Sequence, residues 1–236
     1  MNYMIHAAPA RMWYVNDFLI PAMEQQGINR DCIRVWEDTD HVGNLASCLA
    51  SFASCAQQPG GTWHLQDDVI ISPDFYAQTQ EHDCGVVCGF FAPSLSLSKK
   101  QGNSHIGPQP VQYMWFSFPC IRIPNWLAGE FVAWFENVAR AREKYAERIQ
   151  RGKSDDFFWR QFMKEEHEDM CVFNLVPNLV DHVDYLLGGS LINTKRTDPI
   201  MRSGFWEHED LVTELQERIS RIKTPPEGGA AGREGD

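Results

Sequence analysis

Residues Trp63 to Tyr76 read Trp-His-Leu-Gln-Asp-Asp-Val-Ile-Ile-Ser-Pro-Asp-Phe-Tyr. The apolar lead-in, the adjacent carboxylates of Asp67 and Asp68 and the Pro-Asp-Phe turn indicate a buried strand that ends in an acidic pair. Paired carboxylates at the carboxyl end of a strand suit a hard cation such as Mg²⁺ or Mn²⁺. Such a cation can hold a diphosphate leaving group, so this stretch predicts a binding site for a nucleotide sugar.

Length and composition limit the class of protein. The chain has 236 residues and a 43% hydrophobic fraction, enough for the core of one large domain. It contains no apolar run long enough to span a membrane, and the start Met-Asn-Tyr-Met-Ile-His lacks the pattern of a signal peptide, so we expect a cytoplasmic protein. The seven scattered cysteines predict reduced thiols rather than a zinc site. A net charge of −11 argues against a surface that coats DNA, but leaves a local basic groove open.

The first part of the chain alternates between apolar runs and turn signals. The order strand, helix, strand, helix, strand is typical of a parallel α/β sheet, in which ligands bind at the carboxyl ends of the strands. Gly27 is a natural stop for the first helix. We predict strands at Tyr3–Ala8, at Cys32–Trp36, in the run before Asp67 and at Gly85–Phe91, and helices at Val15–Gln26 and Leu45–Ala56.

The second part begins with a segment rich in Ser, Gly, Pro and Lys, and its remaining elements are less regular in order. We therefore predict one domain over 1–223, with a nucleotide-binding half over 1–91, an acceptor half with a C-terminal arm over 92–223, and a disordered tail over 224–236. The predicted elements are an exposed loop (Ala92–Pro110), strands at Gln112–Ile123 and Met170–Leu175, a helix capped by Asn125 that runs to about Gln150, and helices at Phe157–Glu168 and Asp210–Ile222.

Three further groups of polar residues suggest chemistry. Asp155 and Asp156 open a predicted helix, where carboxylates can act as a base or only favour the helix dipole. His182 ends the run Pro177-Asn178-Leu179-Val180-Asp181-His182, and it can bind a metal or pair with a nearby aspartate. A basic segment follows, in which cations can screen a diphosphate or simply offset an acidic protein. Its basic residues are Lys195, Arg196 and Arg202.

In their order and spacing, these features resemble the glycosyltransferases of the GT-A fold, especially the compact enzymes found in bacteriophage genomes. The resemblance spans Tyr3 to Arg202 and rests on the N-terminal α/β half, Gln66-Asp67-Asp68, Asp155-Asp156 and the run that ends in His182. It implies an α/β, GT-A-like fold: a Rossmann-like, mostly parallel central sheet flanked by helices. The acidic motif of the family is Asp-any-Asp or a variant with Glu first. Gln66 stands in that first place here, which weakens the case for a metal.

The resemblance also assigns roles to residues. Asp68 is implied as a metal ligand, Asp67 as a second ligand or a ribose contact, and His182 as the third ligand of Mn²⁺ or Mg²⁺. A turn in which two aspartates merely cap the strand is the alternative. Asp156 is implied as the base that deprotonates the acceptor, with Asp155 orienting that acceptor. The residues implied in binding the nucleotide sugar are Ala8, Arg11, Asp38, Asn44, Asp67, Lys195, Arg196 and Arg202.

The implied activity is transfer of a sugar from a nucleotide sugar, UDP-linked by expectation, to a hydroxyl. In a phage, where the protein would work in the host cytoplasm, the acceptor could be a 5-hydroxymethylpyrimidine in DNA. A glycan or a protein acceptor, a nucleotidyltransferase and a degenerate nucleotide-binding module without activity are the alternatives. No glycine-rich loop with a following Lys supports the nucleotidyltransferase, whereas Gln66 is the best argument for the degenerate module. No membrane partner is expected, and the oligomeric state is not predicted.

Overall fold

A computed structural model describes residues 1–40, 42–89, 107–110, 119–152, 155–175, 179–183, 186–187 and 209–223. Its strands are β1 (Asn2–Ala7), β2 (Ile33–Glu37), β3 (Gly61–Gln66), β4 (Val69–Ile71), β5 (Val86–Cys88), β6 (Gly107–Pro110), β7 (Cys120–Pro124), β8 (Cys171–Asn174) and β9 (Val180–His182). Its α-helices are α1 (Met12–Tyr14), α2 (Ile20–Gln25), α3 (Asn44–Ala56), α4 (Phe75–Glu81), α6 (Asn125–Trp134), α7 (Glu143–Gln150), α8 (Asp155–Glu166) and α9 (Glu209–Lys223). Short 3₁₀ turns, η1 (Pro9–Arg11) and η3 (Arg30–Cys32), and π-helical turns, η2 (Val15–Leu19) and η5 (Phe135–Ala139), complete the elements.

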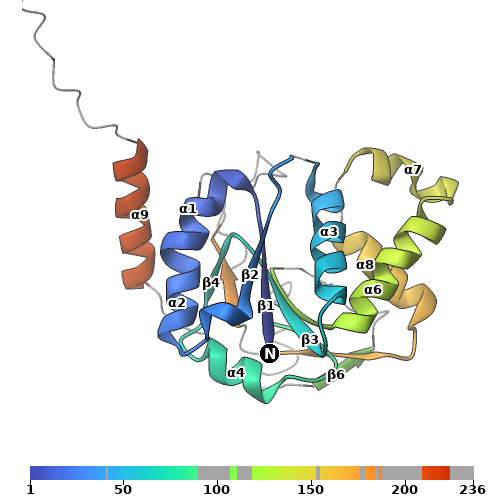
Figure 1. Ribbon diagram of the computed structural model, residues 1–236, viewed down its shortest axis with the longest axis horizontal. Helices are drawn as coiled ribbons and strands as arrows, with labels where there is room; N and C mark the ends of the chain where they lie inside the picture. Colours follow the sequence, from blue (N-terminus) through green and yellow to red (C-terminus); the bar gives the residue numbers. More distant parts are fainter. Residues whose placement is uncertain are drawn as a thin grey trace, which may run out of the picture.

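The central sheet has the strand order β2-β1-β3-β7-β5-β8-β6. β1 pairs in parallel with β2 and β3, and β5 pairs in parallel with β8, whereas β7 and β6 are antiparallel to their neighbours. Most of the strands therefore run in one direction, and helices cover both faces of the sheet (Figure 1). The predicted fold class, α/β with a mostly parallel central sheet flanked by helices, is confirmed. A separate two-stranded sheet joins β4 to β9.

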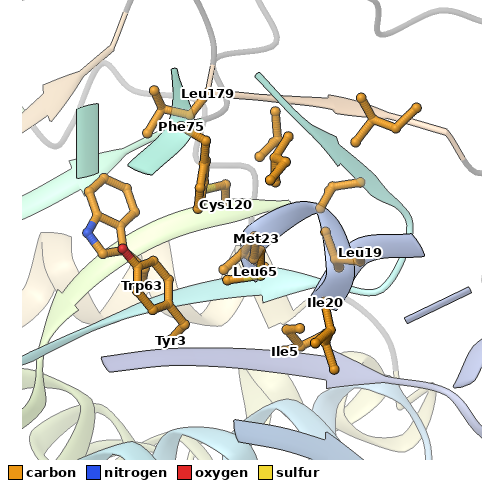
Figure 2. Packing of buried hydrophobic residues seen from close by; sticks show 14 of the residues in the cluster. Tyr3, Ile5, Leu19, Ile20, Met23, Trp63, Leu65, Phe75, Cys120 and Leu179 are labelled. Carbon is orange, nitrogen blue, oxygen red and sulfur yellow. The ribbon is translucent and has the colours of Figure 1, made fainter. Parts of the chain in front are cut away.

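Alternation along β1 divides the core between the two faces of the sheet. Tyr3, Ile5 and Ala7 face α2, α4 and α9, together with Trp63 and Leu65 of β3. Figure 2 shows Leu19, Ile20 and Met23 packed over this face, with Phe75 and Leu179 at its edge. On the opposite face, Met4 joins a cluster built from α3, α6 and α8. Its centre is aromatic: the ring of Phe131 lies 5.6 Å from Phe52 and 5.2 Å from Trp159.

Two predictions about the helix after β7 are wrong. The predicted continuous helix to Gln150 breaks after η5, because Arg142 is extended, with φ −95° and ψ 117°. The break turns Tyr145 into the core, where its ring lies 5.5 Å from that of Phe158. Asn125 does not cap the helix, since Pro124 holds that position. Its side chain instead accepts a hydrogen bond from Thr62 Oγ1 (2.8 Å) and donates one to the Gln58 carbonyl (2.9 Å).

The other boundaries agree more closely, with one further correction. The end of the predicted loop over Ala92–Pro110 forms β6, which pairs with β8. Residues 90–106, most of the predicted strand from Gln112 and the predicted tail over 224–236 lie outside the described residues. Gly27 ends the first helix as predicted, with φ +96°. In the described part of the chain, no helix combines the length and apolar character needed to cross a membrane.

Candidate functional site

Asp67 and Asp68 form the turn between β3 and β4, at the carboxyl edge of the central sheet. β1 and β2 end at the same edge, because both run parallel to β3. The two aspartates are only 6% and 7% exposed, so their carboxylates are largely withdrawn from water. Buried carboxylates need partners, and the neighbouring elements supply them.

Arg11 is the central partner of the acidic pair. It ends η1, the 3₁₀ turn that follows β1, and its side chain points back across the end of β3. Arg11 Nη1 lies 2.9 Å from Asp67 Oδ1, and the same nitrogen donates to Asp68 Oδ2. The guanidinium therefore bridges both carboxylates from one side.

Two further hydrogen bonds fix the segment that carries Arg11. The backbone N–H of Ala8 donates to Asp67 Oδ2 at 2.6 Å. The hydroxyl of Tyr14 donates to the Val69 carbonyl at 2.6 Å, and the Tyr14 ring is buried. The segment is thus tied to the acidic turn both before and after Arg11.

His182 reaches the acidic pair from a segment more than 100 residues later in the sequence. β9 pairs antiparallel with β4 so that His182 lies opposite Val69. Its Nε2 lies 3.2 Å from Asp68 Oδ1, and the backbone N–H of Val183 donates to the Asp68 carbonyl at 2.7 Å. The structure therefore brings the three residues predicted as metal ligands into one cluster, the acidic corner, which comprises Arg11, Asp67, Asp68 and His182.

The environment separates the acidities of the two aspartates. Burial and the charge of Asp68 raise the pKa of Asp67 to about 6. Burial also opposes ionisation of Asp68, but His182 and Arg11 outweigh it and hold the pKa of Asp68 well below its ordinary value. Asp68 is therefore the permanently ionised member of the pair.

The donor set of the acidic corner fits a divalent cation in its chemistry, because two carboxylates and an imidazole suit Mn²⁺. These carboxylates, however, already have partners in the protein. Arg11 and the Ala8 N–H donate to the Asp67 oxygens and Arg11 donates to Asp68 Oδ2, while among the described residues Asp68 Oδ1 has His182 Nε2 at 3.2 Å without a hydrogen bond. Within the described ranges no three His, Cys, Asp or Glu side chains are arranged to hold a metal ion. The metal prediction stays a prediction.

Two predicted nucleotide contacts lie along the same edge. Asp38 follows β2, its backbone N–H donates to the Ala7 carbonyl at 3.0 Å, and its Oδ1 accepts from Val42 N at 3.0 Å. Asn44 begins α3 after Gly43, whose φ of +92° suits a glycine. The carboxyl ends of β1, β2 and β3 therefore contribute polar residues to one rim, as the sequence predicts. Lys195, Arg196 and Arg202 lie outside the described residues.

Asp155 and Asp156 begin α8, as predicted, but face different surroundings. Asp155 is 6% exposed and lies against the side chains of Asn44 and Cys48 on α3. Burial, aided by the charge of Asp156, raises the pKa of Asp155 to about 7. Asp156 is less buried, and its Oδ1 accepts from Phe157 N at 2.8 Å. Burial also raises the pKa of Asp156, although the Phe157 N–H and two arginines oppose the rise.

Two histidines that the sequence analysis did not select lie beneath α3. His6 of β1 and His64 of β3 face this helix, with their rings 5.9 Å apart. His6 Nε2 lies 2.7 Å from Ser47 Oγ, and His64 Nε2 lies 2.9 Å from Ser51 Oγ. Burial lowers the pKa of His6 to about 4, against the opposing charges of two acidic residues, and lowers that of His64 well below its usual range. Their position on the helix-facing side of alternating strands was the available signal.

The pKa of His6 predicts a loss of stability in acid. An unfolded histidine binds a proton near pH 6.5, whereas native His6 stays neutral until about pH 4. The free energy of unfolding is therefore unaffected by the protonation of His6 above pH 6.5. It falls as the pH drops toward 4, by about 2 kcal/mol after allowance for partial exposure of the side chain. We expect His6→Gln to remove this loss in urea unfolding between pH 7 and pH 4. An unchanged pH dependence in the variant would contradict the assignment.

Comparisons with known proteins add distant structural similarity. No protein-family model matches the chain, and no curated protein matches its sequence. The crystal structure of A197 from STIV is 12% identical, with a TM-score of 0.39 over 77% of this chain and 85% of that one. A glycosyltransferase involved in the glycosylation of the major capsid of PBCV-1 is 9% identical, with a TM-score of 0.37 over 75% and 83%. S. aureus TarS 1–349 is 11% identical, with a TM-score of 0.45 over 94% and 73%. These similarities are too distant to indicate a reaction.

Proposed function

We propose that this chain transfers a sugar from a nucleotide sugar, UDP-linked, to a hydroxyl acceptor. The observation that carries the proposal is the acidic corner, where Arg11, Asp67, Asp68 and His182 meet at the carboxyl ends of parallel strands. Open α/β sheets bind their ligands at this edge. A rim with buried opposite charges offers both cationic and anionic contacts to a nucleotide diphosphate.

The donor would lie along the ends of β1 and β2. Asp38, which follows β2, would accept hydrogen bonds from the ribose, and Asn44 at the start of α3 would be a further contact. Arg11 is the described cation nearest to the acidic pair and can turn toward the diphosphate. When bound, a Mn²⁺ or Mg²⁺ ion at Asp67, Asp68 and His182 would stabilise negative charge on the leaving diphosphate. Lys195, Arg196 and Arg202 are proposed to add positive charge to the same group.

Asp156 is our candidate for the base in an inverting transfer. It would take the proton of the acceptor hydroxyl while that oxygen bonds to the anomeric carbon and the bond from this carbon to the diphosphate breaks. Its smaller burial favours it over Asp155, which lies against α3. Asp155 would then orient the start of α8, and through it Asp156.

The acceptor is proposed as a hydroxyl, with a 5-hydroxymethylpyrimidine in DNA as the first candidate and a glycan or protein hydroxyl as the others. The net charge of −11 does not favour broad contact with duplex DNA. A DNA acceptor would therefore need a local basic track, and its binding should weaken steeply with salt. Transfer to all three acceptor classes can be followed with the same labelled donor.

A panel of nucleotide sugars tests the proposal directly. We expect one UDP-sugar at saturating concentration to stabilise the native state by about 3 kcal/mol and to raise Tm by several degrees. We also expect slow release of UDP from that donor, because water can replace a missing acceptor. The control is Asp68→Asn, which should lose both effects. Stabilisation without turnover, with any acceptor, would favour the non-catalytic nucleotide-binding module, and no response to any donor would refute the proposal.

A further inference from the structure

Three of the four carboxylate oxygens of Asp67 and Asp68 accept hydrogen bonds within the protein, and the fourth, Asp68 Oδ1, has among the described residues only the ion-pair contact with His182. Asp67 Oδ1 faces Arg11 Nη1 at 2.9 Å, and its Oδ2 accepts the Ala8 N–H at 2.6 Å. Asp68 Oδ2 accepts from Arg11, and its Oδ1 faces His182 Nε2 at 3.2 Å. A divalent cation bound to both carboxylates would come close to the positively charged Arg11 guanidinium, which already contacts both of them.

The ion pairs of Arg11 with Asp67 and Asp68 are buried, and hydrogen bonds hold the backbone on both sides of Arg11 in place. The Arg11 side chain is 6% exposed, in contrast to a surface arginine that can leave its acid at little cost. The Ala8 N–H and the Tyr14 hydroxyl tie the backbone on both sides of Arg11 to the turn that carries the aspartates. Of the described partners, moving the guanidinium alone would leave Asp67 with only the Ala8 N–H and Asp68 with only the contact to His182, which is unfavourable for two buried charges.

The Arg11 guanidinium and a divalent cation would both neutralise the negative charge of Asp67 and Asp68. Arg11 and His182 both lie against the Asp68 carboxylate, so they offset its negative charge without a metal. Without Arg11, the neighbouring buried carboxylates of Asp67 and Asp68 would lack the cation that contacts both of them. Their negative charges would repel each other, and a divalent cation would reduce that repulsion.

We propose that Arg11 closes the acidic pair against divalent cations in the nucleotide-free protein. Arg11 is thereby a specificity-determining residue for the site: its guanidinium takes the place at Asp67 and Asp68 that a cation would need. One consequence rests on the proposed function, namely that a cation enters together with the donor, whose diphosphate gives Arg11 another partner. The closed state itself is a property of the free protein.

Binding of Mn²⁺, measured by EPR on nucleotide-free protein, tests the closed state. We expect weak binding to the wild type and binding at least about tenfold tighter to Arg11→Gln, in which the acidic pair lacks its partner. Arg11→Lys retains one positive charge and should bind as weakly as the wild type. Adding Asp68→Asn to Arg11→Gln should abolish the gain and so locate the ion. Arg34→Gln is the matched control, because it removes an exposed arginine away from the acidic corner and should change nothing.

Two outcomes would overturn the proposal. The first is wild-type protein that binds Mn²⁺ as tightly as Arg11→Gln, and the second is a folded Arg11→Gln that gains no affinity. Circular dichroism checks the fold, and Arg11→Met serves as a second variant if the glutamine variant does not fold. Because no donor is present, failure here is distinguishable from failure of the proposed sugar transfer.

Discussion

Replacing Asp68 with alanine is expected to lower the free energy of unfolding by about 3 kcal/mol and to reduce sugar transfer by at least about 100-fold. Asp68 is buried, permanently ionised and shared between Arg11 and His182. Its removal takes this carboxylate away from the imidazole and takes one of the two described carboxylates away from the guanidinium. Urea unfolding gives the first quantity, and transfer from the donor identified in the panel gives the second.

The control for stability is an ion pair at the surface. Asp17 pairs with Arg218 of α9, and both side chains are 42% exposed. Asp17→Ala should therefore cost less than about 1 kcal/mol and leave transfer unchanged. If Asp68→Ala changes both the free energy of unfolding and sugar transfer as little as Asp17→Ala does, the acidic corner is neither a stabilising cluster nor a functional site. A stability loss with normal transfer would retain the cluster and reject its proposed role.

The sequence could predict the frame of the site because its signals are local. Apolar runs that end in polar turns define β1, β2 and β3, and parallel strands bring the turns after them to one edge of the sheet. The acidic pair and His182 then meet because β9 pairs with β4, a short strand directly after the aspartates. The sequence shows both segments, whereas the family resemblance alone suggested that they belong together.

The partnership of Arg11 with the acidic pair could not be predicted in the same way. The sequence places an arginine after the first strand, but the direction of its side chain depends on η1 and on the hydrogen bond from Ala8 to Asp67. His6 and His64 were missed for a related reason. A histidine in an apolar strand becomes distinctive only when a serine of the covering helix lies opposite, as Ser47 and Ser51 do.

The helix break before α7 shows where periodicity fails. Helical spacing continues through the charged residues after Val138, so the pattern alone predicts one long helix. Tertiary contacts decide otherwise, because a bend at Arg142 allows the Tyr145 hydroxyl to donate to Glu165 Oε1 at 2.8 Å. Arg142 also pairs with Glu165. The packing of α7 against α8 thus overrides the local pattern.

Asp155→Asn is expected to make the protein more stable than the wild type at pH 8 and to remove a large part of its pH dependence between pH 4 and pH 7. Native Asp155 has a pKa of about 7, whereas an unfolded aspartate releases its proton near pH 4. Between these values the native state binds more protons than the unfolded state, so stability falls as the pH rises. The shift corresponds to roughly 2–4 kcal/mol, which asparagine avoids by remaining neutral.

Urea unfolding of both proteins at several pH values measures this difference, and titrating groups distant from Asp155 cancel because they are common to both. The same variant separates two roles for the start of α8. If Asp155 only orients this helix against Asn44 and Cys48, Asp155→Asn should retain most transfer activity at pH 8, whereas Asp156→Asn should lose it by about 100-fold or more. If the Asp155 variant loses activity while the Asp156 variant keeps it, our assignment is wrong, and the buried carboxylate of Asp155 is the base.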